Sequence, residues 1–155
     1  MKVLKSLFHG LATFIIVAAI GSSVILFWQT SNTVCKPGQD DNKFIATTSQ
    51  YMERTASLFR QISTDPSIAV NPEWRTQVQS AAVTYQSMVA NMDLSPLLDS
   101  ARTDAIYIAS ESINAALNLS TLNPSAANKN AENIAYTTET LRSKIDTYNK
   151  LCRKE

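Results

Sequence analysis

Residues 124–152, PSAANKNAENIAYTTETLRSKIDTYNKLC, are the stretch that decides the fold of this chain. Apolar and small residues recur there in alternating steps of four and three, forming a stripe of Ala127, Ala131, Ile134, Thr138, Leu141, Ile145, Tyr148 and Cys152. A spacing that averages about 3.5 residues is typical of helices that pack side by side at shallow angles. The spacing therefore predicts a helix from about Pro124 to Leu151 with one buried face.

Three earlier segments carry the same kind of spacing. They predict helices from about Asn42 to Ser63, from Pro72 to Met92 and from Pro96 to Leu117. The stripe of the second segment consists of Trp74, Val78, Ala81, Tyr85, Met88 and Met92. No segment of comparable length alternates with period two, so strands are not expected. Short links make neighbouring helices antiparallel, and the sequence predicts an all-α fold, an up-down-up-down antiparallel four-helix bundle over residues 42–152.

Prolines mark three of the expected helix starts. In each case a residue that can cap free backbone N–H groups stands just before the proline, namely Asn71, Ser95 and Asn123. Proline suits the first turn of a helix because its missing N–H group would have no partner there. The three pairs therefore predict capped helix starts rather than breaks inside longer helices.

The N-terminal segment predicts a membrane anchor. The run from Leu7 to Trp28 contains no Asp, Glu, Lys or Arg. As a helix it spans about 33 Å, which is enough to cross the hydrocarbon core of a bilayer. The run is also longer than the apolar part of a cleavable signal peptide, so we expect a single-pass signal-anchor helix that is retained. Within it, small residues repeat at the spacing that lets membrane helices approach closely: Ala18, Ala19, Ser22 and Ser23.

Two lysines orient the expected anchor. Lys2 and Lys5 precede the run, and the positive-inside rule places them in the cytoplasm. The predicted order is therefore a cytoplasmic N-terminus (1–6), the transmembrane helix (7–28), a juxtamembrane linker (29–41), the extracytoplasmic bundle and a short C-terminal tail (153–155). A bacterial periplasm or cell surface is the expected compartment, and the bilayer is the first expected partner.

The two cysteines are expected to form a disulfide. Cys35 follows the anchor and Cys152 lies close to the C-terminus. In an antiparallel four-helix bundle both chain ends lie at the same end of the domain, so the topology brings the two thiols together. A disulfide persists outside the cytoplasm. Two free buried thiols, or a bridge between two molecules, are the alternatives.

The composition includes few residues suited to catalysis or to nucleic-acid binding. The formal net charge is +1, and no basic run carries interleaved aromatic residues. The one histidine, His9, falls in the expected anchor, so the usual base for a serine or cysteine nucleophile and the histidine ligand of a di-metal bundle are missing from the expected domain. The acidic residues of the helices mostly fall off the apolar stripes and are expected to face solvent. No catalytic, cofactor or metal site is predicted, and the protein is not expected to be an enzyme.

Apolar residues gather in the two links expected at the end of the bundle farthest from the anchor. They are Ile68, Val70, Leu119 and Leu122, with Trp74 at the start of the next helix. An exposed apolar group can mark a docking surface. The alternative is that these residues fold over the bundle end as staples. A glycosylation sequon at Asn118 lies nearby, but such triplets are frequent by chance.

These observations predict a non-enzymatic accessory or interaction protein. Its bundle would dock on a larger membrane or envelope assembly through a protein partner or a second copy. A ligand-sensing bundle is the alternative, since the layout is similar in outline to the sensory domain of bacterial chemoreceptors. The likeness is one of architecture only, because no shared motif assigns functional residues to positions of this sequence. A protective protein that blocks a toxin or phage at the envelope also remains open.

Overall fold

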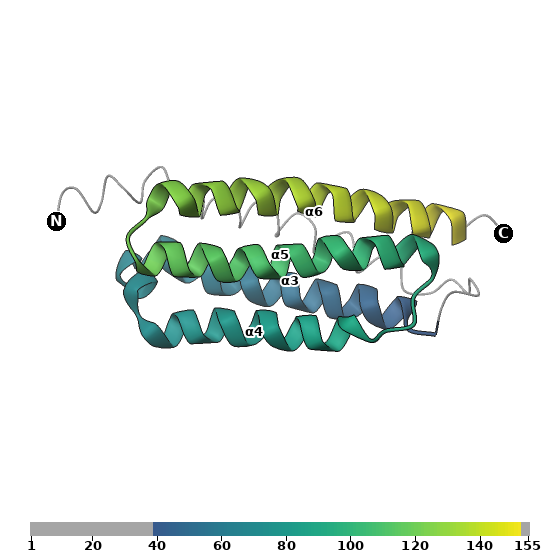
Figure 1. Ribbon diagram of the computed structural model, residues 1–155, viewed down its shortest axis with the longest axis horizontal. Coiled ribbons are helices and arrows are strands. Elements are labelled where there is room, and N and C mark those ends of the chain that lie inside the picture. Colours follow the sequence, from purple (N-terminus) through teal and green to yellow (C-terminus); the bar gives the residue numbers. More distant parts are fainter. Residues whose placement is uncertain (1–38, 153–155) are drawn as a thin grey trace.

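The computed structural model describes residues 39–152. They form helices α3 (Asp41–Thr64), α4 (Pro72–Ala90), α5 (Pro96–Ser120) and α6 (Pro124–Cys152), with a short 3-10 helix η1 (Pro66–Val70) between α3 and α4. Figure 1 shows the four long helices lying side by side, with their links at the two ends of the domain. No strand occurs among residues 39–152, so the prediction of an all-helical bundle is confirmed for this part of the chain.

The predicted helix ends need small corrections. Helix α5 continues past Leu117 to Ser120, whereas α4 ends at Ala90 rather than at Met92. The guanidinium of Arg102 donates hydrogen bonds to the carbonyl oxygens of Ala90, at 2.9 Å, and Met92, at 2.6 Å. The carbonyl groups at the end of α4 would otherwise need the N–H donors of another helical turn. A side chain from α5 supplies these donors instead.

Two of the three predicted caps are present. The side-chain oxygen of Asn71 accepts a hydrogen bond from the N–H of Glu73 at 2.8 Å, and Asn123 accepts one from Ala126 at 3.3 Å. The prediction was wrong for Ser95, whose side chain makes no cap hydrogen bond. The backbone N–H of Ser95 makes a different contact: it donates to the Asp41 carboxylate at 2.8 Å. This hydrogen bond ties the α4–α5 link to the start of α3.

The core follows the predicted stripes with one clear exception. Met88 is 49% exposed, although the stripe of α4 included it. Val89 takes the core position instead and is fully buried. A straight helix has 3.6 residues per turn, so a stripe drawn at 3.5 drifts around the helix over several turns. Helices α5 and α6 contribute a series of buried alanines, which suits helices packed at short distance: Ala101, Ala105, Ala109, Ala115, Ala116, Ala127 and Ala131.

The base of the bundle is the end that holds the start of α3, the α4–α5 link and the end of α6. The tip is the opposite end, formed by η1 and the α5–α6 link (Figure 1). Fully buried Asp41 accepts a hydrogen bond from the hydroxyl of Tyr148 in addition to that from Ser95. Burial and the Asp41 carboxylate together raise the pKa of Tyr148 to about 12. The start of α3 and the end of α6 therefore meet at the base.

Candidate functional site

The tip residues divide into buried and exposed groups. Trp74 and Leu119 are buried, and Ile68 is partly buried against the core. The indole N–H of Trp74 donates to the carbonyl oxygen of Leu58 at 2.9 Å, and its ring meets that of Phe59 edge to face. These three predicted tip residues therefore pack over the end of the bundle. The packing is favourable because it removes a large apolar area from water.

Val70 and Leu122 are the two predicted tip residues that remain exposed, at 50% and 56%. Leu122 also has a φ angle of 56°, the only positive value for a residue other than glycine among residues 39–152. Glycine or asparagine usually occupies such a position after a helix, because a leucine side chain crowds its own backbone there. Leu122 is therefore both strained and exposed.

The backbone of the tip is held in place by local hydrogen bonds. The carboxylate of Asp65 accepts from the N–H of Ser67 at 3.0 Å and from its hydroxyl at 2.7 Å. These bonds hold the pKa of the Asp65 carboxyl below its usual range. The N–H of Asn123 donates to the carbonyl oxygen of Asn118 at 2.8 Å. The two exposed apolar side chains are thus carried by ordered links rather than by long loops.

Glu111 is a functional candidate that the sequence pattern missed. It was expected to face solvent with the other helical acids, but it is 8% exposed. Its carboxylate accepts hydrogen bonds from the side-chain amides of Asn133 at 2.7 Å, Asn130 at 3.1 Å and Asn114 at 3.3 Å. The amide of Asn118 donates to Asn130 at 2.7 Å and extends this cluster, which we call the Glu111 network.

The Glu111 network is suited to joining α5 to α6 rather than to chemistry. Its members line the two helices, and the ion pair of Lys144 with Asp104, at 2.6 Å, continues the polar contact toward the base. Among residues 39–151 no three His, Cys, Asp or Glu side chains gather as metal ligands. The side-chain nitrogen of Asn118, which glycosylation would modify, is occupied by its hydrogen bond to Asn130.

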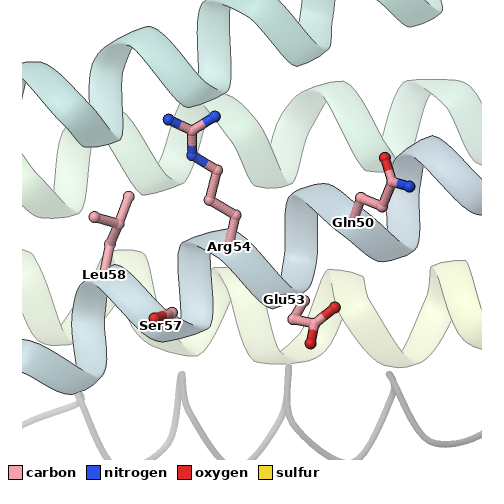
Figure 2. A pocket seen from close by; sticks show the side chains of 5 residues that line it. All are labelled: Gln50, Glu53, Arg54, Ser57 and Leu58. Atoms are coloured by element: carbon pink, nitrogen blue, oxygen red, sulfur yellow. The ribbon is translucent and has the colours of Figure 1, made fainter.

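The surface also has a shallow hollow along α3. Gln50, Glu53, Arg54, Ser57 and Leu58 line it, and all five come from this one helix (Figure 2). Leu58 is buried, whereas the four polar side chains are exposed. Figure 2 shows the Arg54 guanidinium extending away from the Glu53 carboxylate, so the two charges do not converge on one point. The hollow offers no enclosed arrangement of groups for a small ligand.

Several predicted site residues lie outside the described part of the chain. These are Cys35 and the expected anchor residues Ala18, Ala19, Ser22 and Ser23. The backbone of Cys152 ends α6, but the position of its thiol is not described. No helix within residues 39–152 is long and apolar enough to span a bilayer.

Comparisons of the chain with protein-family models, with curated proteins and with solved structures gave no match.

Proposed function

We propose that this protein is a non-enzymatic, membrane-anchored interaction protein. Its extracytoplasmic bundle docks on a protein of a larger membrane or envelope assembly, and Val70 and Leu122 at the tip provide the apolar contact. The observation that carries the proposal is the conformation of Leu122, which combines a positive φ angle with 56% exposure.

The strain at Leu122 favours a role in binding. A residue other than glycine in the left-handed region costs about 1–2 kcal/mol. Folding stability alone favours glycine or asparagine at this position, and a leucine that is 56% exposed keeps only part of the burial that would offset the cost. Strained backbone of this kind is typical of ligand clamps and contact sites, where the side chain is useful for another reason. A contact with a partner supplies such a reason.

The rest of the tip supports the proposal. Val70 lies at the end of η1, which is fixed to the core by fully buried Ala69. The two exposed side chains are therefore presented from a preorganised surface, which lowers the entropy lost on binding. The apolar run from Leu7 to Trp28 supports attachment to a bilayer. Because α3 begins at the base, the proposal assigns the tip to the end of the domain farther from that attachment.

A pair of matched variants tests the proposal. Leu122→Asn removes the apolar contact but suits a positive φ angle, so it should fold at least as well as the wild type. Leu97→Asn is the control, because Leu97 is a leucine of similar exposure, 41%, at the base. The full chain is purified in mild detergent after cross-linking, and co-purified proteins are identified by mass spectrometry. A partner recovered with the wild type and with Leu97→Asn, and lost with Leu122→Asn, supports docking at the tip.

Two results would contradict the proposal. Equal recovery of the same partner by both variants would exclude Leu122 from the contact. A monomer with no co-purified protein at native expression would argue against an accessory role altogether. In that case a thermal-shift screen of the full chain against small molecules would test the ligand-sensing alternative.

A further inference from the structure

Charge is divided unevenly between the helices. From Thr76 to Met92 the sequence contains no Asp, Glu, Lys or Arg, and this range includes most of α4. Helices α3 and α6 carry most of the charged side chains of the four long helices. The outer side of a helix at the surface of a globular domain is normally charged as well as polar. An uncharged outer side therefore indicates a surface with a role other than contact with water.

One side of α5 is exposed but uncharged. Its positions recur in steps of three and four, and we call them the α5 strip: Ser100, Thr103, Tyr107, Ser110, Asn114 and Leu117. Ser110 is partly buried and the other members are exposed, with Tyr107 at 43% and Leu117 at 47%. The outer side of α6 has the same spacing but includes four exposed charged residues: Lys129, Glu132, Glu139 and Asp146. The absence of charge is thus particular to the α5 side of the domain.

The α5 strip belongs to the face of the domain that runs from α4 across α5 to α6. Figure 1 shows α5 between these two helices, and α5 packs closely on both. The charges that border the strip are neutralised in pairs. Arg102 lies 2.9 Å from Asp99, and Lys144 of α6 lies 2.6 Å from Asp104. The strip therefore has no unpaired charge of α5 beside it, because Glu111, the remaining acid of this helix, is buried.

The serine hydroxyls of the strip already have partners within the chain. The Ser100 hydroxyl donates to the carbonyl oxygen of Leu97 at 3.0 Å. The Ser110 hydroxyl donates to the carbonyl oxygen of Ile106 at 3.1 Å and accepts from the side-chain amide of Gln86 at 2.9 Å. A second surface can cover these hydroxyls without leaving them unsatisfied.

We propose that the α5 strip is the contact between two copies of this chain, which pair through their α5 helices about a two-fold axis. A two-fold contact places a surface against itself, so a charge on the strip would meet the same charge of the other copy. An uncharged strip avoids this repulsion, whereas a different protein is normally selected by complementary charge. Tyr107 and Leu117 supply the apolar contact, and exposed aromatic residues with few charges are typical of interface cores.

The two copies are expected to be parallel. This orientation rests on the proposed membrane anchor, because two chains held in one bilayer by their N-terminal segments point in the same direction. The strip has the seven-residue spacing of a coiled-coil seam, with Ser100, Tyr107 and Asn114 at equivalent positions. In a parallel seam each Asn114 meets its counterpart, and an asparagine at such a position favours two strands in register. Confinement to one bilayer also raises the effective concentration of the copies.

Cysteine cross-linking tests the pairing and its direction. Thr103→Cys and Leu117→Cys are introduced singly into the full chain in its membrane. Each should form a disulfide-linked dimer on mild oxidation, because a parallel seam brings the same residue of both copies within about 7 Å. The controls are Ser57→Cys on the exposed side of α3 and the wild type, which reports any bridge through the native cysteines.

Dimer yields at least about fivefold above both controls would support the proposal, because residues outside the contact are too far apart to be bridged. Yields equal to those of the controls would overturn it. A dimer that forms only when chains with Thr103→Cys and chains with Leu117→Cys are mixed would overturn the parallel orientation.

A charge substitution tests whether the uncharged strip is the contact. Thr103→Glu should leave the fold intact because the side chain is exposed, but it places like charges opposite each other, so the dimer Kd should rise at least about tenfold. Ser57→Glu adds the same charge on α3 and should leave the Kd unchanged. Tyr107→Ser removes apolar contact without adding charge and should also raise the Kd. Energy transfer between labelled copies in lipid vesicles measures the Kd, and circular dichroism checks that each variant is folded.

A wild type that stays monomeric in vesicles would contradict the dimer, and so would one Kd shared by the wild type, Thr103→Glu and Tyr107→Ser. The contact at the tip is tested separately, because Leu122→Asn should leave the dimer Kd unchanged. Loss of a tip partner with Leu122→Asn and loss of the dimer with Thr103→Glu are therefore independent results, and either proposal can fail without the other.

Discussion

Asp41 at the start of α3 and Tyr148 near the end of α6 are joined by a hydrogen bond at the base of the bundle. The same carboxylate accepts the N–H of Ser95, so one buried group holds three separate parts of the chain. Asp40 adds a reciprocal pair of hydrogen bonds with Asp93, at 3.0 and 3.2 Å. These contacts hold the start of α3, the α4–α5 link and the end of α6 together at the base.

The contact between the start of α3 and the end of α6 leads to a prediction for the cysteines. Cys35 precedes Asp41 by six residues, which can reach about 20 Å when extended, and Cys152 follows Tyr148 by four. We expect these thiols to form an intramolecular disulfide outside the cytoplasm. By restricting the unfolded chain, it should raise the free energy of unfolding by about 4–5 kcal/mol.

Electrophoresis with and without reductant, combined with thiol labelling, checks the disulfide. Cys35→Ser and Cys152→Ser should lower the stability by the same amount as reductant, and the double variant should no longer respond to reductant. Two thiols that label without reductant would contradict the prediction. A dimer band that disappears on reduction would indicate a bridge between two molecules instead.

Alkaline pH should destabilise the domain. The pKa of Tyr148 is raised to about 12 in the folded protein, whereas a tyrosine of the unfolded chain loses its proton near pH 10. Above about pH 10 the unfolded chain releases a proton that the folded chain keeps, so the free energy of unfolding falls as the pH rises toward about 12. Burial of Tyr51 and Tyr85 acts in the same direction.

Thermal unfolding midpoints measured from about pH 8 to about pH 12 check this dependence. Tyr148→Phe should weaken it without abolishing it, because two buried tyrosines remain. Tyr136→Phe is the matched control, since Tyr136 is exposed and should leave the profile unchanged. A midpoint that stays constant above pH 10 would refute the assignment of Tyr148 as a buried hydrogen-bond donor.

Loss of the Glu111 carboxylate should weaken the pairing of α5 with α6. Glu111→Ala leaves the amides of Asn130 and Asn133 without their acceptor, and we expect it to lower the free energy of unfolding by about 1–3 kcal/mol. Glu111→Gln keeps one acceptor oxygen and should cost less. Denaturant unfolding measures both, and Glu132→Ala on the exposed face of α6 should change the stability by less than about 0.5 kcal/mol. An equal effect of Glu111→Ala and Glu132→Ala would show that the network contributes nothing.

Replacement of Leu122 should stabilise the isolated protein. Leu122→Gly removes the crowding of a positive φ angle, which costs about 1–2 kcal/mol, but it also makes the unfolded chain more flexible. We therefore expect a net gain of up to about 1 kcal/mol, measured by denaturant unfolding. Leu97→Gly is the comparison, because Leu97 lies in the first turn of α5, where glycine should destabilise. A loss of stability with Leu122→Gly would mean that its side chain contributes to the folded tip.

Within residues 39–152, the sequence alone predicted the number, order and approximate length of the long helices. It did so because the apolar spacing and the Asn71 and Asn123 caps act within a few residues of the chain. It failed at Ser95, whose side chain makes no cap hydrogen bond, and at Met88, because a stripe drawn at 3.5 residues per turn drifts around a straight helix and Val89 takes the core position.

The polar interior was decided only by the tertiary structure. Glu111 resembles any helical acid in the sequence, and its burial depends on amides that α6 places opposite it. Likewise, Trp74 and Leu122 looked alike as apolar tip residues, yet one fills the core and the other is held exposed by a strained link. Local spacing determines which segments become helices, because helix formation depends on near neighbours in sequence. Which side chains become buried, paired or exposed depends on groups brought together from distant parts of the chain.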